Sequence, residues 1–136
     1  MSYKEPKHLK SAWSGQSHRQ DKSWGHEVTW TAFDTIHGKI LSMNRGGKTS
    51  FKKHQHKNEV FYILTGKVKV FYGDELSLED VVAHPFVERV LKEGEVLFVQ
   101  SNCPYQITAL EDSKLIEIGD KTRTSTVYLD RTDSNE

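Results

Sequence analysis

Lysine, histidine and glutamate side chains with a suggestive spacing occur together in one segment of the chain, residues 46–66. If residues 50–54 and 59–66 form antiparallel strands joined by a polar turn, side chains at alternate positions lie on one face. Lys52 and His54 then point the same way, and Glu59 faces them from the returning strand. Imidazole and carboxylate groups bind divalent ions and also transfer protons. The segment therefore predicts a metal site or an acid–base site.

The rest of the chain has the pattern of short strands that such a site needs. Turn residues such as Gly38, Gly66 and Gly94 separate β-rich runs at intervals typical of a sandwich or barrel. The runs are residues 27–33, 38–44, 50–54, 59–66, 67–73, 86–92, 95–100, 105–110, 114–119 and 124–129. Residues 75–83 fit neither a strand nor a helix period and predict an irregular excursion. The absence of a long helical pattern argues against a parallel α/β fold.

Composition limits the classes of function. A chain of 136 residues predicts one domain, and 19 Lys+Arg against 19 Asp+Glu, with a pI near 7.1, argue against nucleic acid or an anionic membrane as partner. Apolar runs are too short to span a bilayer and no signal peptide is evident. The single cysteine, Cys103, excludes an internal disulfide and predicts a cytoplasmic protein.

Three regions are predicted along the chain. Residues 1–23 form an N-terminal arm, because they show no periodicity and Leu9 and Trp13 are their only large apolar anchors. Residues 24–130 form a β-barrel, and residues 131–136 form a polar C-terminal tail.

The spacing of the segment from Gly46 resembles the cupin superfamily. The first cupin motif reads G-x5-H-x-H-x4-E-x6-G, and this chain has Gly46, Lys52, His54, Glu59 and Gly66 at those positions. The second motif, G-x5-P-x-G-x2-H-x3-N, matches in spacing from Gly94. Its other positions are replaced by Gln100, Asn102, Tyr105 and Ala109.

Four landmarks extend the resemblance to the small cupins of the type II mannose-6-phosphate isomerase group. They lie at residues 22–27 (KSWGHE), 38–41 (GKIL), 50–54 (SFKKH) and 127–129 (VYL). The match covers roughly residues 22–129. It implies an all-β fold, the double-stranded β-helix or small jelly-roll barrel of the cupins, and a site at the mouth of the barrel.

Carried over by position, the family's four metal ligands fall on Lys52, His54, Glu59 and Tyr105. An ammonium group has no lone pair with which to bind a metal, so two alternatives remain open. In the first, His54, His56 and Glu59 bind a divalent ion such as Mn, Fe, Ni or Zn. In the second the site holds no metal: Lys52 compensates the charge of Glu59, and His54 with Tyr105 forms an acid–base pair.

The resemblance implies a small anionic or sugar-like ligand in the barrel mouth. Trp24, Lys48 and Lys53 are the candidate ligand-binding residues, and Lys57 adds to the local positive charge. The implied activity is that of a sugar-phosphate isomerase. A metal-free nucleotide-sugar isomerase or epimerase and a non-catalytic binding protein are the alternatives. A homodimer is expected, and four other histidines, His8, His18, His37 and His84, are predicted to be surface residues.

Overall fold

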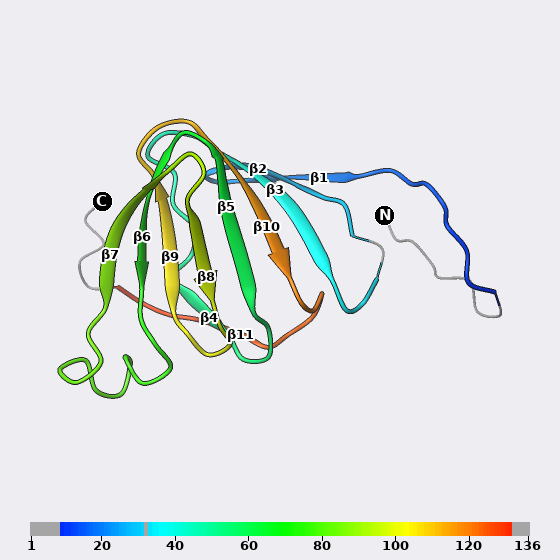
Figure 1. Cartoon of the computed structure of the whole chain (residues 1–136). Coiled ribbons are helices and arrows are strands. Elements are labelled where there is room, and N and C mark those ends of the chain that lie inside the picture. The colour runs from blue at the N-terminus through cyan, green and yellow to red at the C-terminus, as the bar shows by residue number, and fades with distance from the viewer. Residues whose placement is uncertain (1–8, 32, 132–136) are drawn as a thin grey trace.

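The computed structural model describes residues 9–31 and 33–131, in which eleven strands and no helix occur (Figure 1). The strands are β1 (His18–Lys22), β2 (Gly25–Thr29), β3 (His37–Met43), β4 (Lys52–His54), β5 (Glu59–Thr65), β6 (Lys67–Tyr72), β7 (Val87–Lys92), β8 (Val96–Val99), β9 (Tyr105–Ala109), β10 (Ser113–Gly119) and β11 (Thr126–Tyr128). Each of the ten predicted runs overlaps a strand, and residues 75–83 lie in turns, so the all-β prediction is confirmed. Within the described ranges no helix could cross a membrane.

The strands form two antiparallel sheets. The larger has the order β1-β2-β3-β10-β5-β8, and the smaller has the order β11-β4-β9-β6-β7. The chain therefore crosses from the smaller sheet to the larger between β4 and β5, and it crosses back between β8 and β9. This crossing brings Lys52 and His54 of one sheet opposite Glu59 of the other.

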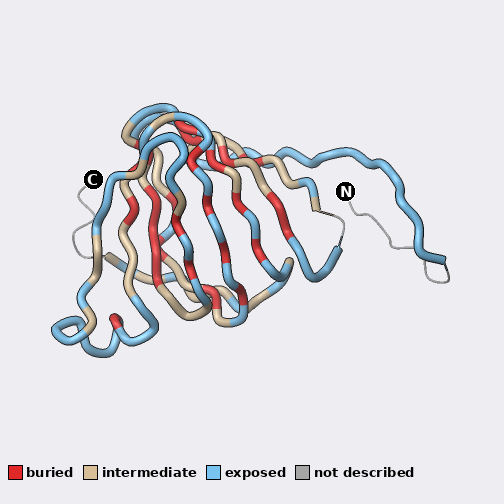
Figure 2. Tube along the Cα trace, in the orientation of Figure 1, coloured by how far each residue is buried: buried red, intermediate tan, exposed pale blue. Residues whose placement is uncertain are grey.

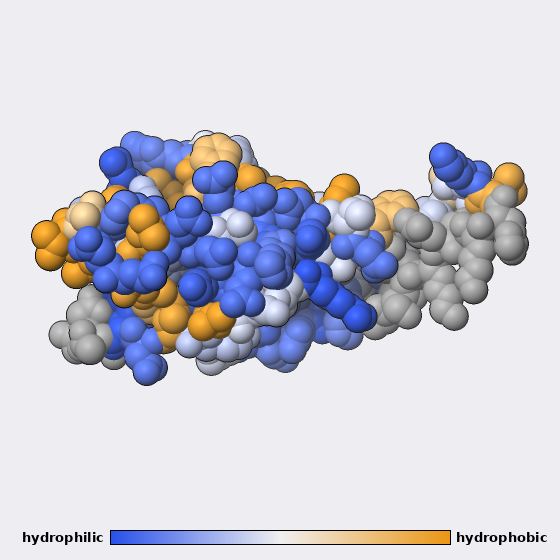
Figure 3. All heavy atoms as spheres, turned by 90° about the horizontal axis from the view of Figure 1, so that it is seen from below, coloured by the Kyte–Doolittle hydropathy of each residue, from blue (hydrophilic) through white to orange (hydrophobic). Residues whose placement is uncertain are grey.

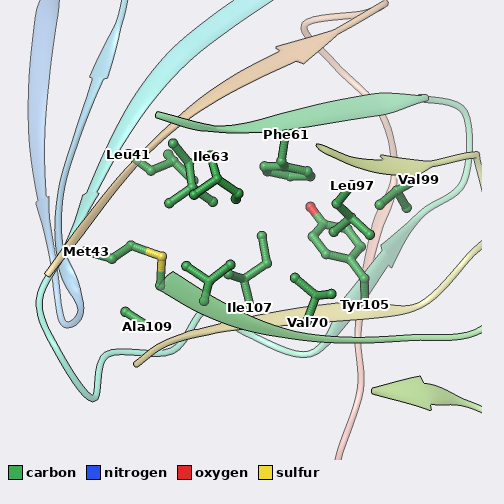
Figure 4. Close-up of a cluster of buried hydrophobic side chains, with 12 residues drawn as sticks. Leu41, Met43, Phe61, Ile63, Val70, Leu97, Val99, Tyr105, Ile107 and Ala109 are labelled. Atoms are coloured by element: carbon green, nitrogen blue, oxygen red, sulfur yellow. The ribbon is translucent and has the colours of Figure 1, made fainter. Parts of the chain in front are cut away.

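Alternating side chains fill the space between the sheets. In β5, Phe61 and Ile63 point inward and are almost completely buried, whereas Tyr62 and Leu64 are exposed. The buried positions follow this period of two on the central strands (Figure 2), as the pleat of a strand requires. The core contains Leu41, Met43, Phe61, Ile63, Val68, Val70, Leu97, Val99, Tyr105, Ile107, Ala109 and Leu115 (Figure 4). Burying one such side chain contributes about 1.5–3 kcal/mol.

The larger sheet begins earlier than the predicted barrel. Residues 18–22, expected within the arm, form β1 and pair with β2 from His18 opposite Thr29 to Lys22 opposite Gly25. All five residues of β1 are exposed. Because neither face of this strand is buried, its sequence needs no alternation of apolar and polar residues, and the pattern that identifies other strands is missing. Residues 1–8 and 132–136, which were also assigned to the arm and tail, lie outside the described residues.

Two groups of neighbouring apolar residues are among the exposed side chains of the described residues. The outer apolar face consists of neighbouring exposed residues on three strands of the larger sheet: Val60, Tyr62, Leu64, Phe98 and Ile118. A second group lies in the excursion between β6 and β7, where Leu76, Leu78, Val81 and Val82 are exposed. Figure 3 shows apolar residues gathered at the end of the molecule where this excursion lies, beside a largely hydrophilic face.

Candidate functional site

A cavity of about 390 Å³ opens between the two sheets. It is lined by Lys22, Ser23, Trp24, Glu27, Lys39, Leu41, Lys48, Thr49, Ser50, Lys52, His54, Lys57, Glu59, Phe61, Tyr105, Ile107, Glu117, Thr126 and Tyr128. Five lysines and three glutamates are among these residues, so with neutral histidine the cavity has an excess of positive charge. The protein is neutral as a whole, and this positive charge is therefore a local property of the site.

Glu59 is the centre of the polar network in the cavity. The hydroxyl of Tyr105 donates a 2.6 Å hydrogen bond to Glu59 Oε1, and His54 Nε2 lies 3.3 Å from the same oxygen. The Lys57 ammonium lies 3.5 Å from Oε2. Burial by itself would raise the pKa of Glu59. The contacts with His54, Tyr105 and Lys57 outweigh it and hold that pKa well below its usual range, so Glu59 is ionised.

Tyr105 acts on Glu59 as a hydrogen-bond donor. Its ring is buried in the core, with its centroid 5.4 Å from that of Phe61 (Figure 4). Burial, followed by the negative charge of Glu59, raises the pKa of the Tyr105 phenol well above its usual value. The phenol therefore keeps its proton at neutral pH and stabilises the carboxylate.

Strand pairing at Gly119 of β10 brings His37 and Glu117 close to Glu59. His37 and Glu59 each pair with Gly119, from β3 and β5 respectively, so both side chains lie on the face of the sheet to which Glu117 also points. His37 Nε2 lies 2.6 Å from Glu117 Oε2 and 3.7 Å from Glu59 Oε2. A Cβ atom on Gly119 would overlap the imidazole ring of His37, so this arrangement requires glycine.

The prediction that His37 is a surface residue is therefore wrong. Its side chain is buried, and because a carbonyl oxygen only accepts, His37 Nδ1 donates the 2.9 Å hydrogen bond to the carbonyl oxygen of Lys121. This bond turns Nε2 toward the two carboxylates. The sequence signal for Glu117 was a charged residue in the inward phase of β10, whose other inward residues are Ser113, Leu115 and Gly119. His37 had no comparable local signal.

The cavity gathers most of the predicted site residues. Lys52, His54, Glu59 and Tyr105 line it, as do the predicted ligand-binding residues Trp24 and Lys48. The predicted ligand-binding residue Lys53 is not among the described residues that line the cavity. Lys53 alternates with Lys52 along β4 and lies on the opposite face of that strand.

His56 also lies outside the cavity. It is exposed in the turn between β4 and β5, and its backbone amide donates a hydrogen bond to Thr124 Oγ1. The set His54, His56 and Glu59, expected to bind a metal, is thus not brought together. The turn directs His56 outward, whereas the alternation within the strands directs His54 and Glu59 inward.

The group His37, Glu59 and Glu117 has the donor atoms of a divalent-metal site. One ligand atom from each lies within 4.8 Å of the others, and all three residues are buried. A histidine whose second ring nitrogen donates to a backbone carbonyl is oriented as metal-bound histidines usually are. The position expected from the cupin motif fits a metal poorly, because Lys52 has no free lone pair when charged and the Tyr105 hydroxyl donates to Glu59.

Comparison with solved structures identifies the fold. Oxalate decarboxylase from Bacillus subtilis superposes with a TM-score of 0.70 and 19% sequence identity, over 83% of this chain and 30% of that chain. CapF, in complex with the inhibitor 3-isopropenyl-tropolone, superposes with a TM-score of 0.69 and 16% identity, over 87% of this chain and 35% of that one. This chain thus spans about a third of the length of these proteins. It has the cupin fold, as its motif spacing predicted.

Another structure of the Bacillus subtilis oxalate decarboxylase is described as having Mn(II) centres, and it superposes with a TM-score of 0.68 at 17% identity, over 83% of this chain and 30% of that chain. No family model matches this chain, and no curated protein matches it by sequence.

Proposed function

We propose that this cupin binds a small anionic carbohydrate, a sugar phosphate or a close relative, and moves a proton next to its carbonyl group. The observation that carries the proposal is the cavity itself, in which lysines outnumber glutamates around one buried and ionised carboxylate, Glu59. The resemblance to the mannose-6-phosphate isomerase cupins supports a carbohydrate as the ligand. Oxalate decarboxylase, which has the same fold, is named for a small anionic substrate.

Isomerisation or epimerisation needs a base beside the carbonyl and a positive group to polarise it. His54 and Glu59 are the candidate bases, and Lys52 is the candidate electrophile. Lys57 connects ligand binding to the strength of the base, because its charge is one of the groups that lower the pKa of Glu59. An anionic ligand that draws Lys57 away removes that contribution and raises the pKa of Glu59, while the larger contributions of His54 and Tyr105 remain.

Ligand binding is tested by thermal unfolding with mannose 6-phosphate, fructose 6-phosphate and unphosphorylated mannose. A ligand at about 100 times its Kd stabilises a protein by about 2.7 kcal/mol. We expect the sugar phosphates to raise the Tm and mannose to leave it unchanged. Lys57→Met abolishes the rise, and Lys53→Met, on the outer side of β4, preserves it. No rise with either sugar phosphate contradicts the proposal.

Turnover separates an enzyme from a binding protein. Incubation in deuterium oxide, followed by mass spectrometry of the recovered sugar phosphate, detects proton exchange next to the carbonyl. Exchange that is lost in Glu59→Gln supports the isomerase or epimerase. Binding without exchange supports the alternative, a cupin that holds its ligand without turnover.

A divalent ion is a second candidate for this cavity, favoured by the orientation of His37 toward Glu59 and Glu117. These three residues would hold the ion, which would supply Lewis-acid polarisation of an oxygen ligand. Elemental analysis of protein purified without chelators tests it. Stoichiometric Mn, Fe, Ni or Zn that is lost in His37→Gln and retained in His56→Gln supports the site. Metal-free protein that Mn²⁺ and Zn²⁺ fail to stabilise contradicts it.

A further inference from the structure

Lys52 has a tyrosine as its register partner on each neighbouring strand. It pairs with Tyr105 of β9 on one side and with Tyr128 of β11 on the other, and all three side chains line the cavity. Its Nζ atom lies 5.1 Å from the centroid of the Tyr105 ring. The amine thus lies at the cavity wall, near the ring of the buried Tyr105.

The carboxylates of the cavity are held by other groups. Glu27 accepts a 2.8 Å hydrogen bond from Lys39, Glu117 contacts His37, and Glu59 contacts His54, Tyr105 and Lys57. Within residues 9–31 and 33–131, no hydrogen bond or ion pair to Lys52 Nζ is present. Burial lowers the pKa of Lys52, and the more distant charges of Glu117 and Glu59 compensate only in part. A larger share of this amine is therefore neutral than for an exposed lysine.

We propose that Lys52 forms a reversible imine with the carbonyl group of an anionic aldehyde or ketone, such as the open chain of a sugar phosphate. The inference rests on the proposed function, in which the positive charge of the cavity attracts the anionic group of the ligand. It changes the role of Lys52 from a fixed charge to a nucleophile.

The chemistry balances without an oxidant or a further reactant. The nitrogen lone pair of Lys52 attacks the carbonyl carbon, and a proton moves from nitrogen to the carbonyl oxygen to give a carbinolamine. The hydroxyl leaves with a proton as water, and the C=N bond forms; uptake of one more proton gives the iminium ion. The nitrogen stays on the same carbon throughout. The imine therefore serves proton exchange or epimerisation at the neighbouring carbon, with His54 or Glu59 as the base.

Trapping with a reductant tests the imine. Dihydroxyacetone phosphate has a ketone and a phosphate, and sodium cyanoborohydride reduces its imine to a stable amine that peptide mass spectrometry locates. Lys53 is the matched control, because it is the next residue of the same strand and faces away from the cavity. In the wild-type protein we expect roughly tenfold more adduct on Lys52 than on Lys53, with inorganic phosphate as an effective competitor. Lys53→Arg keeps the adduct on Lys52. Lys52→Arg keeps the charge but abolishes the adduct in the cavity.

Binding of dihydroxyacetone phosphate, measured by calorimetry without reductant, distinguishes the two proposals. Binding together with an adduct concentrated on Lys52 supports the imine. Binding with no adduct on Lys52, or with adducts spread evenly over exposed lysines, overturns the imine and leaves the proposed function standing. No binding of this ligand or of the hexose phosphates overturns the proposed function, and the imine fails with it.

Discussion

Replacing Tyr105 with phenylalanine removes one oxygen atom and the 2.6 Å hydrogen bond that it donates to Glu59. The ring stays in the core beside Phe61, so the change leaves only a small gap. Both partners are buried, and the Glu59 carboxylate loses a donor in a place from which bulk water is largely excluded. A hydrogen bond to a charged group contributes about 1.5–3 kcal/mol, so we expect Tyr105→Phe to lower the free energy of unfolding at pH 7 by about 2 kcal/mol.

The penalty depends on pH in a direction that the structure fixes. The hydrogen bond stabilises the ionised form of Glu59, whose pKa in the folded protein lies below its usual value of 4.5. Stability from a lowered carboxyl pKa is fully present above the unfolded pKa and is lost as the pH falls toward the folded one. The difference between wild type and Tyr105→Phe should therefore be full at pH 7 and shrink below about pH 4.5.

Urea unfolding followed by tryptophan fluorescence measures both effects, with the m value as the check that the unfolded states are comparable. Tyr128→Phe is the matched control, because its side chain also lines the cavity but is 71% exposed. We expect that control to change stability by less than about 0.5 kcal/mol. Equal and small effects of the two variants, or a Tyr105→Phe penalty that is constant with pH, would refute the assignment of Tyr105 as the donor to buried Glu59.

Three further outcomes are expected. Gly119→Ala forces the His37 ring away from Glu117 and should lower the free energy of unfolding by about 1–3 kcal/mol in urea. Gly94→Ala, whose added methyl meets open space, should cost less, only about 1 kcal/mol for its positive φ, and a reversed order contradicts the crowding at Gly119. Phe98→Lys, on the outer apolar face where we place the expected contact with a second copy, should turn a dimer into a monomer by light scattering without loss of fold; a wild-type monomer contradicts this. Glu59→Gln should lose less stability than wild type on acidification from about pH 6 to pH 3, and parallel pH curves contradict the low pKa of Glu59.

Local patterns predicted the fold and the centre of the site because both depend on alternation within strands. Lys52, His54 and Glu59 face one cavity because side chains alternate with a period of two along β4 and β5, as their spacing predicted. The same rule explains why Lys53 and His56 are elsewhere: one lies on the opposite phase of a strand, and the other lies in a turn to which alternation does not apply.

His37 could not be found in this way, because its position depends on pairing between distant parts of the chain. It meets Glu117 only because β3 pairs with β10 over a separation of about 80 residues, and it meets Glu59 because β5 pairs with the other edge of β10. No window around His37 contains its partners. A single histidine at the start of a strand is consistent with an exposed residue as well as with a buried one.

The contact of His37 with Gly119 has a consequence for sequences related to this one. The imidazole ring fills the volume in which any other residue at position 119 would place its Cβ atom, so the two positions are physically coupled. Chains that share this fold and retain a histidine equivalent to His37 should retain a glycine equivalent to Gly119, whereas chains without that histidine are free to vary there. This pair of residues, 82 positions apart, is thus a criterion for recognising proteins that have the same buried cluster, independent of the histidines and lysines of the cupin motif itself.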